Sequence, residues 1–119
     1  MTPPLTTLAD NTLIKLALAG QTECFAVLID RHKGAVRRRI ASMVQNKADA
    51  DDLFQEALLK VWHHLPTFRS ESSFRTWMTR VAINEVLQAY RHTSLLHAWN
   101  SHGQFAAMLS AFLQSIVRS

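Results

Sequence analysis

The sequence predicts an all-α fold, a compact bundle of about four helices with a further amphipathic helix near the C-terminus. Apolar residues recur at helical spacing over long stretches, while Val, Ile and Thr form no alternating runs. Three glycines and three prolines in 119 residues leave few turns, as is typical of helical proteins rather than of sandwiches or barrels. This length suits one domain, and the 48% of hydrophobic residues is the share of a globular chain.

Two helices are expected in the first part of the chain. The spacing of apolar residues predicts a short helix over 11–19, which stops at Gly20. A second helix is expected over 22–45, with six basic residues on its outward faces. Gly34 lies inside this second helix at a cost of about 1 kcal/mol relative to alanine, which suggests a bend or a close neighbour there.

Two more helices follow, each with a boundary signal. Asp49 is expected to cap the third helix, which ends at Leu65 because a residue before proline is disfavoured in a helix. Ser72 or Ser73 is expected to cap the fourth, which extends to Arg91. The apolar stripe expected to face the core from the third helix consists of Leu53, Phe54, Ala57, Leu58, Val61 and Trp62.

Residues 92–119 differ in character from residues 1–91, which we expect to form the helical domain. They hold one charged residue, Arg118, and an apolar stripe predicts a fifth, amphipathic helix. This stripe either folds back on the domain or docks on a partner or a second copy of the chain. Its members, which are also the candidates for self-association, are Phe105, Met108, Leu109, Phe112, Leu113 and Ile116.

Catalysis and metal binding are not expected, and neither is a cofactor. His92, His97 and His102 are five residues apart, whereas helical ligand pairs favour spacings of three or four. A single cysteine, Cys24, excludes a cysteine zinc cluster, and no glycine-rich phosphate loop is present. The longest apolar stretch, 105–113, is about half a membrane span and no signal peptide is visible, so a cytoplasmic protein is expected.

Charge is distributed in blocks along the chain. Residues 31–47 contain six bases and no acid, and four acids follow within residues 49–56. The chain from Ala57 onward contains six basic residues and two acidic residues. This order indicates either two kinds of partner surface, one cationic and one anionic, or simply solvated helix faces.

A nucleic-acid partner is suggested by one face of the fourth helix. Thr76, Arg80, Asn84, Leu87 and Arg91 fall within an arc of about 80°. Guanidinium groups there can bind phosphates and an amide can bind a base edge. Phe68 precedes this helix in a polar loop and suits stacking on an unstacked base, although aromatic residues at such positions also serve as core.

Three ordered motifs give a specific resemblance. They are residues 49–56 (DADDLFQE) with Trp62, then Phe68-Arg69, then residues 73–77 (SFRTW) with residues 80–84 (RVAIN). In these motifs the stretch 25–91 resembles region 2 of a bacterial RNA polymerase sigma factor, of the extracytoplasmic-function group in the sigma-70 family. The resemblance implies the helical fold of that region and a role in transcription initiation.

The resemblance also implies two sets of contact residues. The residues implied to bind the clamp helices of the largest catalytic subunit of core RNA polymerase are Asp52, Leu53, Gln55, Glu56 and Lys60. The residues implied to recognise and open the minus-ten promoter element are Phe68, Arg69, Ser70, Glu71, Ser72, Ser73, Arg75, Thr76, Arg80, Asn84 and Arg91. An anti-sigma factor is a further partner that the family implies.

Residues 92–119 depart from the family, whose members continue into a helix-turn-helix region 4. They are too few for that region and lack its basic recognition helix. An alternative to initiation is therefore a regulator that occupies the polymerase clamp without starting transcription, and transcription in vitro separates the two. A helical bundle without a polymerase partner is a third hypothesis, and a metal enzyme is a fourth.

Overall fold

Helices build the part of the chain that the structure, a computed structural model, describes, which is residues 4–91. In chain order they are η1 (Leu5–Thr7), α1 (Asp10–Leu18), α2 (Thr22–Met43), α3 (Lys47–His64), η2 (Leu65–Thr67) and α4 (Phe74–Arg91). The predicted all-α fold with four helices is confirmed. The helix expected from Phe105, like all of residues 92–119, lies outside the described residues.

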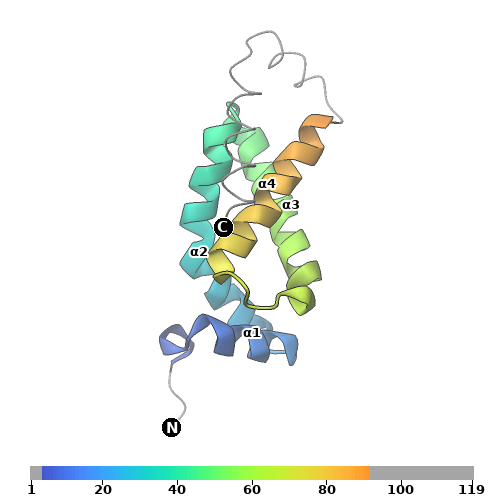
Figure 1. Cartoon of the computed structure of the whole chain (residues 1–119). Coiled ribbons are helices and arrows are strands. Elements are labelled where there is room, and N and C mark those ends of the chain that lie inside the picture. The colour runs from blue at the N-terminus through green and yellow to red at the C-terminus, as the bar shows by residue number, and fades with distance from the viewer. Residues whose placement is uncertain (1–3, 92–119) are drawn as a thin grey trace.

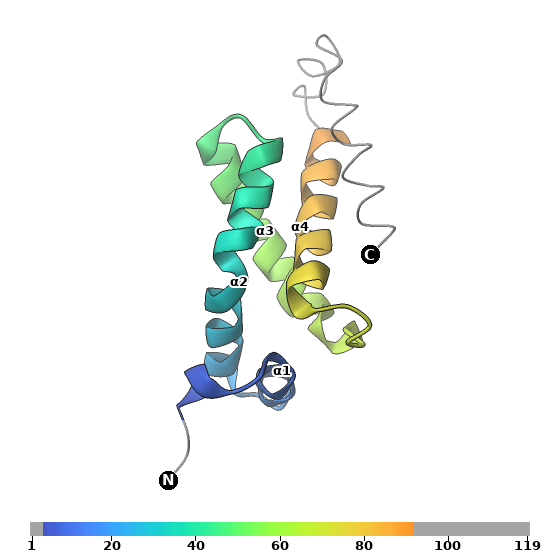
Figure 2. The ribbon, with the colours of Figure 1, turned by 60° about the vertical axis from the view of Figure 1, so that its left-hand side comes forward.

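The long helices α2, α3 and α4 pack against one another, and α1 lies across one end of the bundle (Figures 1 and 2). Helix α3 runs antiparallel to α2, and α4 returns parallel to α2. The ring of Phe74 at the start of α4 lies 5.6 Å from the ring of His32, and Tyr90 near its end contacts Met43. The loop between η2 and α4 therefore lies at the same end of the bundle as α1 (Figure 2).

The core is apolar, and every α-helix contributes to it. Among the residues described, no polar or charged side chain is buried. Cys24, the single cysteine of the chain, is 0% exposed within this core. The largest fully buried side chains include Leu13, Leu28, Ile40, Met43, Leu65, Met78 and Ile83.

The start of α3 corrects one prediction. Asn46, not Asp49, is the N-cap, because its side-chain oxygen accepts from the backbone N–H groups of Ala48 (2.8 Å) and Asp49 (3.2 Å). Asp49 instead lies in the first turn, where a carboxylate favours the positive end of the helix dipole. Asn46 therefore starts the helix, and the acidic side chains that follow it are not needed as the cap and can lie on the helix surface.

The start of α4 and the middle of α2 settle two other expectations. The hydroxyl of Ser73 accepts from the backbone N–H of Thr76 at 3.1 Å, so Ser73 caps α4 as predicted. Helix α2 continues through Gly34 without a break. A Cβ placed on Gly34 meets the Arg38 side chain at 3.5 Å, an ordinary contact, so the close neighbour expected there is absent.

The far end of α4 is attached to α2 by Tyr90. Its hydroxyl donates to the backbone carbonyl of Met43 at 3.1 Å, and the side chain is buried. Burial raises the pKa of Tyr90 well above its usual range, and the carboxylate of Asp49 adds to the effect.

Within residues 4–91, no helix combines the length and apolarity that a membrane crossing requires.

The core predicts a large cost for truncating Leu28, which is 0% exposed. Leu28→Ala is expected to lower the free energy of unfolding by about 2–5 kcal/mol, because it removes buried methyl groups and leaves a cavity. The matched control is Leu59→Ala on α3, where the leucine is 66% exposed and the expected change is below about 0.5 kcal/mol. Urea unfolding followed by circular dichroism measures both, and equal losses would contradict this description of the core.

Tyr90 predicts a loss of stability in alkali. Its pKa is higher folded than unfolded, so its contribution is complete below the unfolded value of about 10 and is lost as pH rises above it. Between pH 10 and 11, Tyr90→Phe is expected to flatten the fall in unfolding free energy measured in urea. Because the chain has one tyrosine, absorbance at 295 nm reports its ionisation directly. Ionisation near pH 10 with helical structure intact would contradict the prediction.

Candidate protein and nucleic-acid interfaces

An acidic face lies on the outer side of α3. It consists of Asp52, Gln55 and Glu56, whose side chains are all exposed. Spacings of three and four residues place these side chains on one side of a helix. Phe54, Ala57 and Val61 occupy the opposite side and are buried. The packing of the core therefore holds this face toward solvent.

Two of the predicted polymerase contacts, Leu53 and Lys60, lie at one edge of the acidic face rather than on it. Leu53 is half-buried and packs against the core. Lys60 turns toward α4, where its ammonium nitrogen lies 3.8 Å from the carboxylate of Glu85. Both residues are rotated about 80–100° around α3 from Asp52, and this explains their separation from it.

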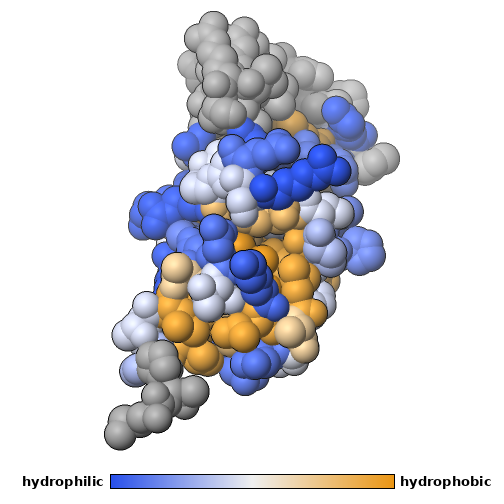
Figure 3. All heavy atoms as spheres, turned by 60° about the horizontal axis from the view of Figure 1, so that its bottom comes forward, coloured by the Kyte–Doolittle hydropathy of each residue, from blue (hydrophilic) through white to orange (hydrophobic). Residues whose placement is uncertain are grey.

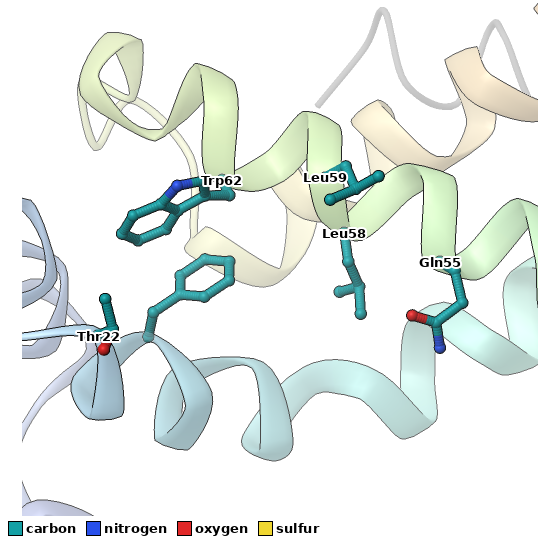
Figure 4. Close-up of a pocket in the computed structure, with 6 residues that line it drawn as sticks. Thr22, Gln55, Leu58, Leu59 and Trp62 are labelled. Atoms are coloured by element: carbon teal, nitrogen blue, oxygen red, sulfur yellow. The ribbon is translucent and has the colours of Figure 1, made fainter.

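An apolar groove continues the acidic face toward α2. It has a volume of about 400 Å³ and is lined by Thr22, Phe25, Gln55, Leu58, Leu59 and Trp62. Figure 4 shows Gln55, Leu58 and Trp62 extending from α3 toward α2. The Trp62 ring meets the Phe25 ring edge to face, with 4.8 Å between centroids.

Trp62 and Leu59 change the expected use of α3. Trp62 was predicted to face the core but is 42% exposed at the groove. Leu59 is 66% exposed and did not belong to the predicted apolar stripe. Its position four residues after Gln55 is the signal that places it beside the acidic face.

A second area of apolar surface lies around the end of the bundle that α1 covers (Figure 3).

The basic residues of α2 do not form one continuous cationic surface. Arg31 turns to α1 and bonds the carboxylate of Asp10 at 3.0 Å. Lys33 pairs with Asp30 on the same helix. The guanidinium of Arg37 lies 4.4 Å from the ring centroid of Phe54 and packs over α3. All six bases of residues 31–47 are exposed or half-exposed, as the prediction of outward faces requires, and Arg31 and Arg37 also contact neighbouring helices.

The loop between η2 and α4 is built around aromatic rings. Phe68 is half-buried and meets two rings of α4, that of Phe74 at 5.9 Å and that of Trp77 at 5.2 Å between centroids. Phe74 is buried in the core, whereas Trp77 is half-buried. The cluster of Phe68, Phe74 and Trp77 therefore joins the core to the surface of this loop.

Beyond Phe68 the loop is polar and open to solvent. Arg69, Ser70 and Glu71 are exposed, and so is Ser73, while Ser72 is half-buried. Ser70 has a φ of 59°, the left-handed conformation that a non-glycine residue rarely adopts. Its hydroxyl also donates to the side-chain oxygen of Asn11 on α1 at 3.4 Å.

The predicted nucleic-acid residues of α4 divide between two sides. Asn84 and Arg91 are exposed, and Arg80 and Thr76 are half-buried beside them. Arg75 is exposed but lies nine residues before Asn84, which is half a turn around the helix. Its Nε donates to His32 at 3.2 Å, so its side chain is directed toward α2.

No cluster of three or more metal-ligating side chains occurs in the described part of the chain. His92, His97 and His102, whose spacing disfavours a shared metal ion, lie outside the described residues.

The family model "Sigma-70 region 2" matches residues 28–96 of the chain. The chain is 30% identical over 88 residues to RNA polymerase sigma factor NccH of Alcaligenes xylosoxydans xylosoxydans, covering 74% of this chain and 47% of NccH. It is 32% identical over 77 residues to the ECF RNA polymerase sigma-E factor of Escherichia coli K12, covering 65% of this chain and 40% of that protein.

A solved structure has the same fold. The structure of CnrH in complex with the cytosolic domain of CnrY matches 85% of this chain and 62% of the solved chain, with a TM-score of 0.61 and 27% identity. CnrH is a sigma factor of Cupriavidus metallidurans, to which the chain is 31% identical over 83 residues, 70% of this chain and 44% of CnrH. The chain spans less than half the length of the curated relatives it matches.

Proposed function

We propose that this chain, which belongs to the sigma-70 region 2 family and to its extracytoplasmic-function group, is a transcription-initiation protein that binds core RNA polymerase and opens the minus-ten promoter element. One observation carries the proposal. The acidic face of α3 and the polar loop before α4 are both exposed but belong to different elements of one core. A protein partner and a DNA strand can therefore be bound at the same time.

The polymerase is proposed to bind along the outer side of α3. A partner coiled coil with basic side chains complements Asp52 and Glu56, which sets its register and speeds its approach. Leu59 and Trp62 add apolar contact area next to these charges. An apolar centre beside a polar rim is the usual composition of a specific protein interface. Leu59 is therefore added to the contacts that the resemblance implies.

The minus-ten strand is proposed to bind at the loop 68–73 and at the Asn84 side of α4. Extrusion of a base from the duplex costs a few kcal/mol, and stacking on an aromatic ring contributes about 1–3 kcal/mol per base. Phe68 and Trp77 are the half-buried rings available for this stacking. Arg69 lies next to them for a phosphate, and Asn84 offers an amide for a base edge.

Opening by this route consumes no chemical energy. The chain binds the melted strand better than the closed duplex, and the difference in affinity shifts the population toward the open state. Arg80 and Arg91 are proposed to hold the backbone further along α4. Arg75, on the other side of the helix, is proposed to contact only a strand that passes around the helix start.

Location and other partners follow from the same proposal. The chain is proposed to work in the cytoplasm, where it meets polymerase and DNA. The solved complex of the relative CnrH with the cytosolic domain of CnrY supports an anti-sigma partner for this chain as well. Self-association through the stripe from Phe105 to Ile116 stays a proposal, as does the division into a region 2 domain (1–91) and a tail (92–119), because residues 92–119 lie outside the described ones.

Charge reversal on α3 is expected to weaken polymerase binding. Asp52→Arg and Glu56→Arg should each lower the affinity for core polymerase at least tenfold, because a buried or rim contact with a basic partner becomes repulsive. Leu59→Ala should also weaken binding while leaving stability nearly unchanged. Retention of the tagged full chain on immobilised core polymerase provides the measurement.

Glu23→Arg is the matched control, since Glu23 is also exposed and the substitution changes charge equally, but at the start of α2. It should bind as the wild type does. If the wild type is retained no better than Asp52→Arg, the assignment of the acidic face to polymerase is wrong.

Two substitutions are expected to affect DNA binding in different ways. Arg69→Ala should weaken all strands and reduce the slope of log affinity against log salt by about 0.7, because one phosphate contact is lost. Asn84→Ala should keep the slope but reduce discrimination at one base about tenfold. The probe is a fluorescein-labelled single strand, selected from a random pool by the complex of the full chain with polymerase. Unchanged anisotropy titrations for both variants would contradict the proposed DNA surface.

A further inference from the structure

A network of charged and polar side chains joins the start of α1 to the middle of α2. The carboxylate of Asp10 binds two consecutive residues, with one oxygen 3.0 Å from Arg31 and the other 2.8 Å from Nε2 of His32. Arg31 also donates to the backbone carbonyl of Thr6 at 2.7 Å. The side chain of His32 is only 11% exposed. The first turn of α1 is thereby held against α2.

His32 extends this network to α4. Its second ring nitrogen, Nδ1, lies 3.2 Å from the Nε of Arg75, which is a donor. Arginine keeps its proton, so Nδ1 must accept, and the imidazole proton lies on Nε2, where it is donated to Asp10. The contacts with Asp10 and Arg75 together favour one arrangement of the imidazole ring, with Nε2 toward Asp10 and Nδ1 toward Arg75. Asp10 from α1, Arg31 from α2 and Arg75 from α4 are the charged groups around the ring.

The two residues of α4 that His32 touches adjoin the loop 68–73. The ring of Phe74 lies 5.6 Å from the His32 ring and 5.9 Å from the ring of Phe68. Asn11, next to Asp10, accepts the hydroxyl of Ser70 at 3.4 Å. Helix α1 therefore reaches the loop in two ways, directly through Asn11 and indirectly through His32.

We propose that His32 is a positioning residue for the strand-binding loop 68–73, an inference that rests on the proposed function. Asp10 contacts Nε2 of His32, and His32 fixes the first turn of α4 through the Nε of Arg75. The terminal nitrogens of Arg75 take no part in that bond. The rings of Phe68 and Trp77 then face an incoming base without further rearrangement. Asp10 precedes residues 28–96, which the family model matches, whereas His32 and Arg75 lie within them.

Two substitutions at His32 separate positioning from packing. His32→Leu removes the acceptor for Arg75, whereas His32→Asn keeps an oxygen close to the Nδ1 position; both remove the ring and the bond to Asp10. The affinity measured is that of the full chain, bound to polymerase, for the selected single strand. We expect His32→Leu to lower this affinity about fivefold, because the first turn of α4, which contains Arg75, must then become ordered on binding. His32→Asn should restore affinity to within about twofold of wild type.

Affinity for core polymerase is the internal control, because the acidic face of α3 takes no part in this network. It should stay within twofold of wild type in both variants. Equal losses of strand affinity in both variants, or wild-type affinity in His32→Leu, would overturn the proposal.

A spectroscopic measurement keeps this test independent of the proposed function. In ¹⁵N-resolved spectra of the free chain, His32 should show the Nε2–H tautomer. The Nε–H of Arg75 should exchange with water more slowly in wild type and His32→Asn than in His32→Leu. A wild type that binds no strand but shows these signals refutes the DNA role alone. A wild type that lacks the signals refutes the positioning role itself.

Discussion

The attachment of α4 to α2 at both ends is the constraint on which the described structure depends. At one end Phe74 and Arg75 meet His32, and at the other the hydroxyl of Tyr90 bonds the carbonyl of Met43. Helix α3 packs against both α2 and α4 with Phe54, Ala57 and Val61 buried on its inner side. That arrangement places the acidic face outward and brings the loop 68–73 to the α1 end of the bundle.

Local signals in the sequence predicted much of this arrangement. The four helices were predicted from apolar spacing, and residue type limited the cap of α4 to Ser72 or Ser73, of which Ser73 is the cap. Asp52, Gln55 and Glu56 were named from the family resemblance, and their exposure agrees with the predicted core stripe on the other side of the helix. Such predictions succeed where helical spacing and capping depend on residues close together in the chain.

The features that could not be predicted depend on contacts between distant residues. Arg31 bonds Asp10 across 21 positions, and Arg75 bonds His32 across 43, so no local pattern reveals either pair. Lys60 lies at the edge of the acidic face and pairs with Glu85 of α4, 25 positions later in the chain. Trp62 was assigned to the core by its spacing, but at the edge of α2 it packs on Phe25 and remains partly in solvent. The cap of α3 is a local feature that was predicted wrongly, because Asp49 was taken as the cap and the side chain of Asn46 accepts the first-turn N–H groups instead.

The burial of Cys24 has a practical consequence for watching this protein at work. The chain has no other thiol, and this one is enclosed by the core at 0% exposure. A maleimide dye added to the folded protein therefore has little to react with until a cysteine is introduced on the surface. One dye carried near the tip of the loop and another on the outer side of α3 would each mark a single known position. Fluorescence from such conjugates would show the order in which the two surfaces are occupied.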